Sequence, residues 1–198
     1  KPLRPGPVTV GFDWFYGIPA SLDMPPYCFV ENDRPTEAPT GEVKWSGRPA
    51  YWRAGAAAPG FKHKDVLPVL GTKSVEVIER HRKQAPTKPF FLYLPLAAPH
   101  TPWLPSAKFK GASGAGDYGD FLTEIDDCVG RVLATVRRLG KKKSTLVFLS
   151  FCGKRRPPDC RIAFVVFSKG AVTKSIRISH PWECFTASLI GMRCWLLH

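Results

Sequence analysis

A continuous apolar run, residues 90–94, is the feature that most constrains the fold of this chain. It has no polar alternation beyond Tyr93, and such strands are typical of a parallel sheet that is covered on both faces. The run leads to His100, which stands between Pro99 and Pro102. Prolines restrict the backbone around the imidazole, so the segment presents His100 as a candidate site residue. The alternative interpretation is a turn that only ends the strand.

Helical patterns flank this run. Residues 65–83 place apolar side chains on one side and charged ones on the other, with Asp65 as the expected N-cap. Gly71 inside this helix costs about 1 kcal/mol relative to alanine. Residues 117–139 carry apolar side chains at spacings of three and four, and Asp117 with Asp120 predicts a start that resembles a capping box.

A second buried strand is predicted at residues 145–150. The order helix, strand, helix, strand predicts right-handed crossovers and an α/β fold with a mainly parallel sheet flanked by helices. Ligands bind such sheets just beyond the carboxyl ends of the strands. We therefore expect His100 and residues 150–153 to face one crevice.

The first 61 residues are rich in proline, glycine and aromatic side chains and show no sustained periodicity. A stretch of this kind is typical of a binding loop or of a fragment separated from its packing partners, and we expect both to apply here. Asp23, Tyr27 and Trp14 are therefore candidates for a substrate pocket, and Thr101 joins them as the neighbour of His100. The alternative for Trp14 is that its ring fills the core.

Other polar residues have less specific patterns. His63 precedes a helix start and His81 lies in a last helical turn, so both are expected to be solvated rather than ligands. Asp126 and Asp127 point about 100° apart on a helix and are expected to form a polar edge rather than one site.

Composition changes abruptly near residue 150. The net charge of +13 is split between residues 1–150, with 21 basic and 14 acidic residues, and residues 151–198, with 8 and 2. This split weakens the case for nucleic acid as a partner. No run is long and apolar enough for a membrane span. We expect an interior segment of a longer protein with a boundary at residue 150, and localisation stays open.

Four segments then occur in a fixed order: Gly-Phe-Asp-Trp-Phe-Tyr-Gly at 11–17, Phe-Phe-Leu-Tyr-Leu leading to Pro-His-Thr-Pro at 90–102, Gly-Asp-Tyr-Gly-Asp with Ile-Asp at 116–126, and Thr-Leu-Val-Phe at 145–148. Together they resemble the sulfatases of the arylsulfatase type across residues 1–150. The resemblance implies a partial alkaline-phosphatase-like sandwich that hydrolyses sulfate esters of small molecules or glycans.

The resemblance also implies a mechanism. Family members use a formylglycine, made from Cys or Ser in a Cys-x-Pro-x-Arg motif, and a calcium ion held by carboxylates and an amide. The hydrated aldehyde attacks sulfur while a histidine assists the leaving oxygen. The histidine of Pro-His-Thr-Pro contacts the sulfate ester in the family, so this catalytic role carries over to His100.

The chain departs from the family at the nucleophile and the metal. No Cys-x-Pro-x-Arg occurs, and the family's paired Asp ligands would lie upstream of Lys1. The family's Ser-Asp-Asn-Gly is Ser150-Phe151-Cys152-Gly153 here, which removes oxygen ligands that calcium requires. We expect no metal ligands in this chain and no activity from the chain alone.

Two interpretations of residues 151–198 stay open, a shifted reading frame or an internal deletion. Residues 161–167 faintly resemble the strand after the family's active-site lysine, which would place Lys154 near that lysine as a second catalytic candidate. Cys152 and Cys160 lack a second pair at zinc-finger spacing, so they do not support a structural zinc site. A shifted frame would predict no coherent structure beyond the strand at 145–150.

The sequence is also consistent with two alternative functions. A phosphoester or phosphonate hydrolase of the same superfamily would differ in its metals and its nucleophile. A non-catalytic binding module is consistent with the missing nucleophile.

Overall fold

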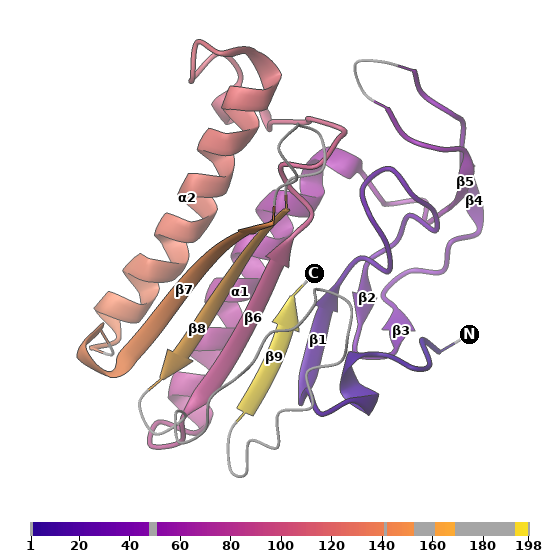
Figure 1. Ribbon diagram of the computed structural model, residues 1–198. Helices are drawn as coiled ribbons and strands as arrows, with labels where there is room; N and C mark the ends of the chain where they lie inside the picture. The colour runs from indigo at the N-terminus through magenta and orange to yellow at the C-terminus, as the bar shows by residue number, and fades with distance from the viewer. Residues whose placement is uncertain (1, 48–50, 141, 153–160, 169–192, 198) are drawn as a thin grey trace.

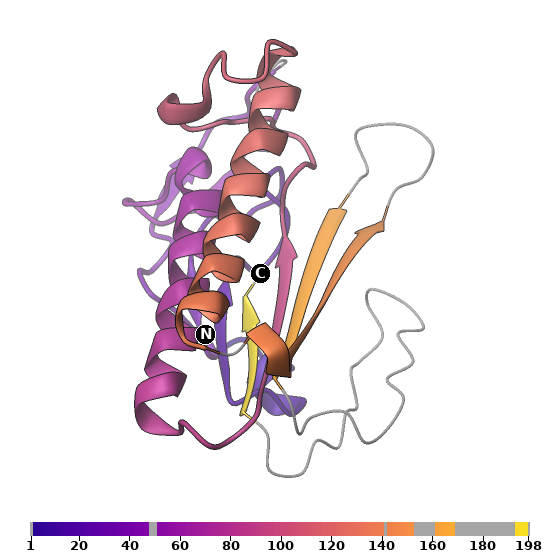
Figure 2. The same ribbon diagram turned by 90° about the vertical axis from the view of Figure 1, so that its left-hand side faces the viewer.

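The computed structural model describes residues 2–47, 51–140, 142–152, 161–168 and 193–197. Its centre is a seven-stranded sheet with the order β3-β2-β1-β9-β6-β8-β7. The two long helices, α1 and α2, lie on one face of this sheet (Figures 1 and 2). A separate two-stranded sheet, β4-β5, forms a hairpin beyond the β3 edge (Figure 1).

The elements follow in chain order. The strands of the large sheet are β1 (Trp14–Gly17), β2 (Val30–Glu31), β3 (Arg34–Pro35), β6 (Phe90–Leu96), β7 (Thr145–Cys152), β8 (Arg161–Ser168) and β9 (Arg193–Leu197). The hairpin consists of β4 (Gly41–Val43) and β5 (Gly55–Ala57), and the helices are α1 (Val66–Gln84) and α2 (Gly116–Arg138). Short 3-10 helices lie at η1 (Pro7–Thr9), η2 (His63–Asp65), η3 (Ala107–Phe109) and η4 (Lys142–Ser144).

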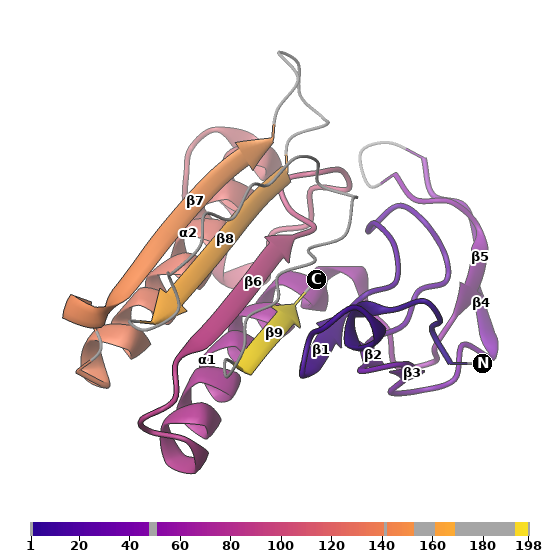
Figure 3. The same ribbon diagram turned by 60° about the horizontal axis from the view of Figure 1, so that its bottom comes forward.

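The α/β class is confirmed, but fewer neighbouring strands pair in parallel than the sequence predicts. Among the described strands of the large sheet, β1-β9 and β6-β9 are the parallel pairs, whereas β1-β2, β2-β3, β6-β8 and β7-β8 are antiparallel. The strands β6 and β7 do point the same way, with β8 between them (Figure 3). The helix and strand order around β6 and β7 does not reveal a later strand that inserts between them.

The strands β8 and β9 come from the part of the chain after residue 150. The strand β8 lies where the deletion interpretation expects one, and it pairs with β6 and β7 along its length. The strand β9 lies between β1 and β6. Lys154 is outside the described residues.

The helix α1 begins at Val66, with Asp65 at the N-cap position, although the Asp65 side chain makes no capping hydrogen bond. Gly71 has a packing reason within this helix, because a Cβ there would meet the Arg131 guanidinium and lie 2.9 Å from Cys128 Sγ of α2. Gly71 destabilises the helix relative to alanine, but the absence of a side chain there allows α1 and α2 to approach closely.

The capping box predicted for α2 does not form. The N-cap is Ala115, and Asp117 lies in the first turn. The Asp120 carboxylate instead accepts hydrogen bonds from Ser113 Oγ at 2.6 Å, Gly111 N at 2.7 Å and Ser113 N at 2.9 Å. These bonds, led by that from the Ser113 hydroxyl, lower the pKa of Asp120. Asp120 therefore binds the loop before the helix rather than the helix N-terminus. The spacing of acidic residues in the sequence does not distinguish these two roles.

The core lies between the helices and the sheet. Its fully buried side chains include Leu70 of α1, Leu92 and Leu94 of β6, and Val132 of α2. On the other face of β6, Phe91 is buried and its ring centroid lies 6.2 Å from that of Phe12. The strand β6 is thus largely buried on both faces, as its continuous apolar run predicts. No helix among the described residues is long and apolar enough to cross a bilayer.

Candidate active site

His100 follows the carboxyl end of β6, at the end of the sheet toward which β7 also points (Figure 1). Its side chain is 18% exposed. Its Nδ1 lies 2.7 Å from the Thr101 carbonyl oxygen. A carbonyl oxygen only accepts hydrogen bonds, so Nδ1 carries a proton and Nε2 is the nitrogen that can exchange one.

A buried carboxylate, Asp23, lies beside this imidazole. Its residue is 6% exposed, and its Oδ1 is 3.9 Å from His100 Nδ1. Within the described part of the chain, Oδ1 has no hydrogen-bond partner. The other oxygen, Oδ2, lies 3.9 Å from Nη2 of Arg53. The structure therefore brings together two candidate site residues predicted from the sequence, His100 and Asp23, which are 77 positions apart in the chain.

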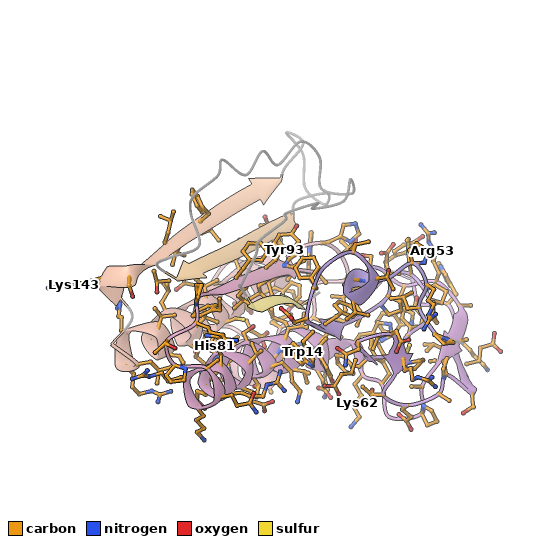
Figure 4. All side chains as sticks on the ribbon, turned by 90° about the horizontal axis from the view of Figure 1, so that it is seen from below. Trp14, Arg53, Lys62, His81, Tyr93 and Lys143 are labelled. Carbon is orange, nitrogen blue, oxygen red and sulfur yellow. The ribbon has the colours of Figure 1, made fainter. Side chains whose placement is uncertain are left out.

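Arg53 is the residue of this group that sequence reasoning missed. Its backbone N–H donates to the Asp23 carbonyl at 3.1 Å, and its own carbonyl accepts a 2.7 Å hydrogen bond from the Tyr27 hydroxyl. Its side chain is 57% exposed, so the guanidinium reaches both Asp23 and solvent. Figure 4 shows Arg53 on the side of the molecule that carries the β4-β5 hairpin. No motif or periodicity around position 53 signals this role.

Tyr27 and Thr101 are placed near the site, but they act on it through other groups. Tyr27 is 2% exposed, and burial raises the pKa of its hydroxyl, which holds the Arg53 backbone. Thr101 is half-buried and provides the carbonyl oxygen that accepts the hydrogen bond from His100 Nδ1–H.

Trp14 lies away from His100 along the sheet direction. It begins β1, whereas His100 follows the carboxyl end of β6, and both strands run parallel to β9 between them. The Trp14 indole N–H donates to Glu31 at 2.9 Å, and the Arg80 guanidinium lies 4.9 Å from its ring centroid. These contacts favour packing rather than substrate binding for Trp14.

The expectation that His63 and His81 are solvated is wrong. His63 is half-buried, with ring centroids 4.4 Å from Trp52 and 4.6 Å from Tyr27, and its burial lowers its pKa to about 4. His81 is 6% exposed, and its Nε2 lies 2.8 Å from the Lys88 carbonyl oxygen. Both rings are covered by segments distant in sequence, which position relative to a helix end does not predict.

The described residues do not fit a calcium ion. They contain no group of three or more His, Cys, Asp or Glu side chains arranged to hold a metal. Asp23 lies between an imidazole and a guanidinium, whereas calcium takes six to eight oxygen ligands. Asp127 pairs with Lys108 at 3.1 Å and Arg131 at 3.2 Å, so it belongs to an ion-pair network on the helix surface.

Known proteins resemble this chain over most of its length. The sulfatase family model matches residues 5–150. An N-acetylgalactosamine-6-O-sulfatase of Bacteroides thetaiotaomicron is 27% identical over 182 residues, covering 75% of this chain and 35% of the relative. The N-acetylgalactosamine-6-sulfatase of Canis lupus familiaris is 42% identical over 144 residues, covering 73% of this chain and 26% of the relative.

A solved structure supports the fold. It comes from work on the metabolism of multiple glycosaminoglycans by Bacteroides thetaiotaomicron, and it matches with a TM-score of 0.60 and 24% identity, covering 74% of this chain and 37% of that chain. The steryl-sulfatase of Rattus norvegicus is 35% identical over 88 residues, which is 44% of this chain and 15% of the relative. The chain thus spans about a third or less of the length of these proteins.

Proposed function

Because this chain belongs to the sulfatase family, we propose that His100 and Asp23 form part of an active site that hydrolyses sulfate esters. The observation that carries this proposal is the convergence of His100, Asp23 and Arg53 beyond the carboxyl end of β6. Ligand sites of open α/β sheets lie at this end of the strands.

The His100 and Asp23 side chains suit departure of the leaving group. When the bond between sulfur and the ester oxygen breaks, the leaving oxygen takes a proton from Nε2 of the His100 imidazolium. The Nδ1–H of His100 keeps its proton and donates to the Thr101 carbonyl oxygen, which fixes the ring orientation. Asp23 is close enough to stabilise the positive charge of the imidazolium before transfer, because its Oδ1 lies 3.9 Å from Nδ1.

The nucleophile and the metal are not part of this proposal for the chain itself. The 198 residues contain no Cys-x-Pro-x-Arg, and the described residues offer no calcium ligand set. A formylglycine would supply the attacking oxygen and calcium would stabilise charge on the sulfuryl group. We infer that this chain by itself binds a sulfate ester without hydrolysing it.

A sulfated glycan is the substrate class that we propose. Two of the relatives are named for N-acetylgalactosamine 6-sulfate, and the matched structure comes from work on glycosaminoglycans. The missing nucleophile favours a second candidate, a binding module that recognises such esters without catalysis.

Binding and turnover are measured separately. Long-range ¹H–¹⁵N spectra of the five histidines, with His100 assigned by the His100→Gln variant, are recorded while 4-nitrophenyl sulfate is added. We expect a saturable shift of the His100 ring signals that leaves the His81 signals in place, because His81 lies beside Lys88 at the other end of β6. 4-Nitrophenyl phosphate is the matched control for a phosphohydrolase.

The outcomes discriminate the candidates. Preferential binding of the sulfate ester without release of 4-nitrophenol, with calcium added, supports a sulfate-ester site in an inactive chain. Preferential binding of the phosphate ester would favour a phosphohydrolase. Absence of any His100 shift would refute the site, and turnover above that of His100→Gln would refute the inferred inactivity.

A further inference from the structure

The hairpin that carries Arg53 has a constant register. Strand β4 pairs with β5 through Gly41 with Ala57 and Val43 with Gly55. Ser46 and Trp52 continue this register, and they exchange backbone hydrogen bonds of 3.1 and 3.4 Å. Each strand has two residues between the Val43–Gly55 pair and the Ser46–Trp52 pair, so the hairpin has no bulge at this point.

This register places Trp45 opposite Arg53. Because Ser46 and Trp52 form a hydrogen-bonded pair, the adjacent Trp45 and Arg53 form a non-hydrogen-bonded pair. Side chains of such pairs lie on the same face of the ribbon and approach closely. The two side chains therefore form one surface.

The contacts of the hairpin show which way this surface faces. Trp52 stacks on His63 with ring centroids 4.4 Å apart, so it points toward the body of the protein on one face. Successive side chains of a strand alternate between faces, and Arg53 accordingly reaches Asp23 instead. Trp45 shares the face of Arg53, which is the face directed toward Asp23, the neighbour of His100.

Trp45 is exposed but supported. It is 65% exposed, the largest fraction among the exposed large hydrophobic side chains of the described residues. A Cβ at Gly47 would lie 3.2 Å from Cη2 of the indole, so the ring rests closely on the Gly47 backbone. Support on one side leaves the other side of the indole available without further ordering, which favours binding.

We propose that Trp45 and Arg53 form a sugar subsite beside His100, in which the indole stacks on a pyranose ring and the guanidinium binds an acidic group of that or the next sugar. This subsite rests on the proposed sulfate-ester function of the His100 site. The negative face of an indole attracts the polarised C–H groups on the flat face of a pyranose. A guanidinium binds a carboxylate or sulfate through paired N–H donors.

The pairing with Arg53 favours an acidic oligosaccharide over an aryl or steryl sulfate. An aryl sulfate has no second anion for the guanidinium once its sulfate lies at His100. An oligosaccharide that alternates uronic acid with sulfated N-acetylgalactosamine provides both a ring and a carboxylate. Hydrogen bonds at its N–H and carbonyl fix the Arg53 backbone, which sets the point from which the guanidinium extends toward such a group.

The test uses the 198-residue chain labelled with 5-fluorotryptophan and a tetrasaccharide of alternating uronic acid and N-acetylgalactosamine 6-sulfate. The chain has six tryptophans, and Trp45→Phe assigns the signal of interest. We expect the tetrasaccharide to shift the Trp45 ¹⁹F signal, and Trp45→Ala to weaken its binding roughly tenfold. Binding of 4-nitrophenyl sulfate at His100 should change less than about twofold in Trp45→Ala.

A second comparison isolates Arg53. Arg53→Gln should weaken binding of the tetrasaccharide more than binding of the methyl glycoside of N-acetylgalactosamine 6-sulfate, because only the tetrasaccharide has a carboxylate. Arg53→Lys should restore part of the difference. Phe148→Ala, an exposed aromatic on the distant edge strand β7, is the matched control and should alter neither affinity (Figure 1).

Failure of this inference is distinguishable from failure of the proposed function. If 4-nitrophenyl sulfate shifts the His100 signals but the tetrasaccharide leaves the Trp45 signal unchanged, or binds Trp45→Ala equally well, the sugar subsite is wrong. If Arg53→Gln weakens both sugars equally, the acidic-group assignment is wrong. If neither sulfate compound perturbs His100, the sulfate-ester site itself is wrong.

Discussion

Acid should destabilise this protein through His63. The imidazole is stacked on Trp52 and lies 4.6 Å from the Tyr27 ring, with its Nε2 buried and without a hydrogen-bond partner among the described residues. Burial favours the neutral ring and lowers its pKa from 6.5 to about 4. In the unfolded chain the ring regains its ordinary pKa, so the unfolded state binds more protons between these two values.

Because the pKa of His63 is lower in the folded state than in the unfolded state, acid lowers the free energy of unfolding. The stability conferred by a neutral His63 is fully present above pH 6.5 and is lost as the pH falls toward 4. The upper limit of the loss is about 3.4 kcal/mol, from about 1.4 kcal/mol per tenfold change in proton affinity. Because the ring is only half-buried, solvent screening reduces the expected loss to about 1–2 kcal/mol.

Urea unfolding at pH 7.5 and pH 5.0 measures this loss, with His63→Phe as the comparison. The variant keeps an aromatic ring but cannot bind a proton. Between the two pH values, we expect the wild type to lose about 1 kcal/mol more than the variant. Equal losses would refute the burial argument. A smaller loss in the wild type would show that cation–π attraction to Trp52 outweighs desolvation.

Three further perturbations test the packing. Gly71→Ala should destabilise the protein by about 1–2 kcal/mol in urea, because the new methyl meets α2, whereas Gly130→Ala, with open space around it, should be neutral or stabilising by up to about 1 kcal/mol; equal effects would contradict the close helix approach. Asp120→Asn should lower Tm at pH 7, and the deficit should shrink as the pH falls from the usual carboxyl pKa through the lowered pKa of Asp120, because the stability from the ionised carboxylate is lost over that range. A pH-independent deficit would argue against this pairing. Tyr27→Phe should cost about 1 kcal/mol in urea by removing the hydrogen bond to the Arg53 carbonyl, and unchanged stability would show that this bond contributes little.

Local patterns predicted the elements that position the site. The helix expected at residues 65–83 is α1 at Val66–Gln84, and that expected at 117–139 is α2 at Gly116–Arg138. The apolar run at 90–94 is the centre of β6. These features repeat within a few residues, so hydrophobic periodicity encodes them directly.

Long-range relations were less predictable. The position of β8 between β6 and β7, and the burial of His63 and His81, depend on segments that are distant along the chain. Capping residues show the same limit, since Asp120 has the spacing of a capping box but bonds to the preceding loop. A side chain with several possible partners is assigned only when tertiary packing brings one of them within reach.

The sequence by itself determined the α/β class, the family resemblance and the place of His100 after an apolar strand, because each rests on local order and spacing. Only the tertiary structure decided that Asp23 lies beside His100 and that Arg53 joins them. Asp23 and Arg53 belong to an aperiodic stretch whose path is set by packing and backbone pairing rather than by local propensity. The Tyr27 hydrogen bond and the register of the β4-β5 hairpin fix that path, and both form only once the chain has folded.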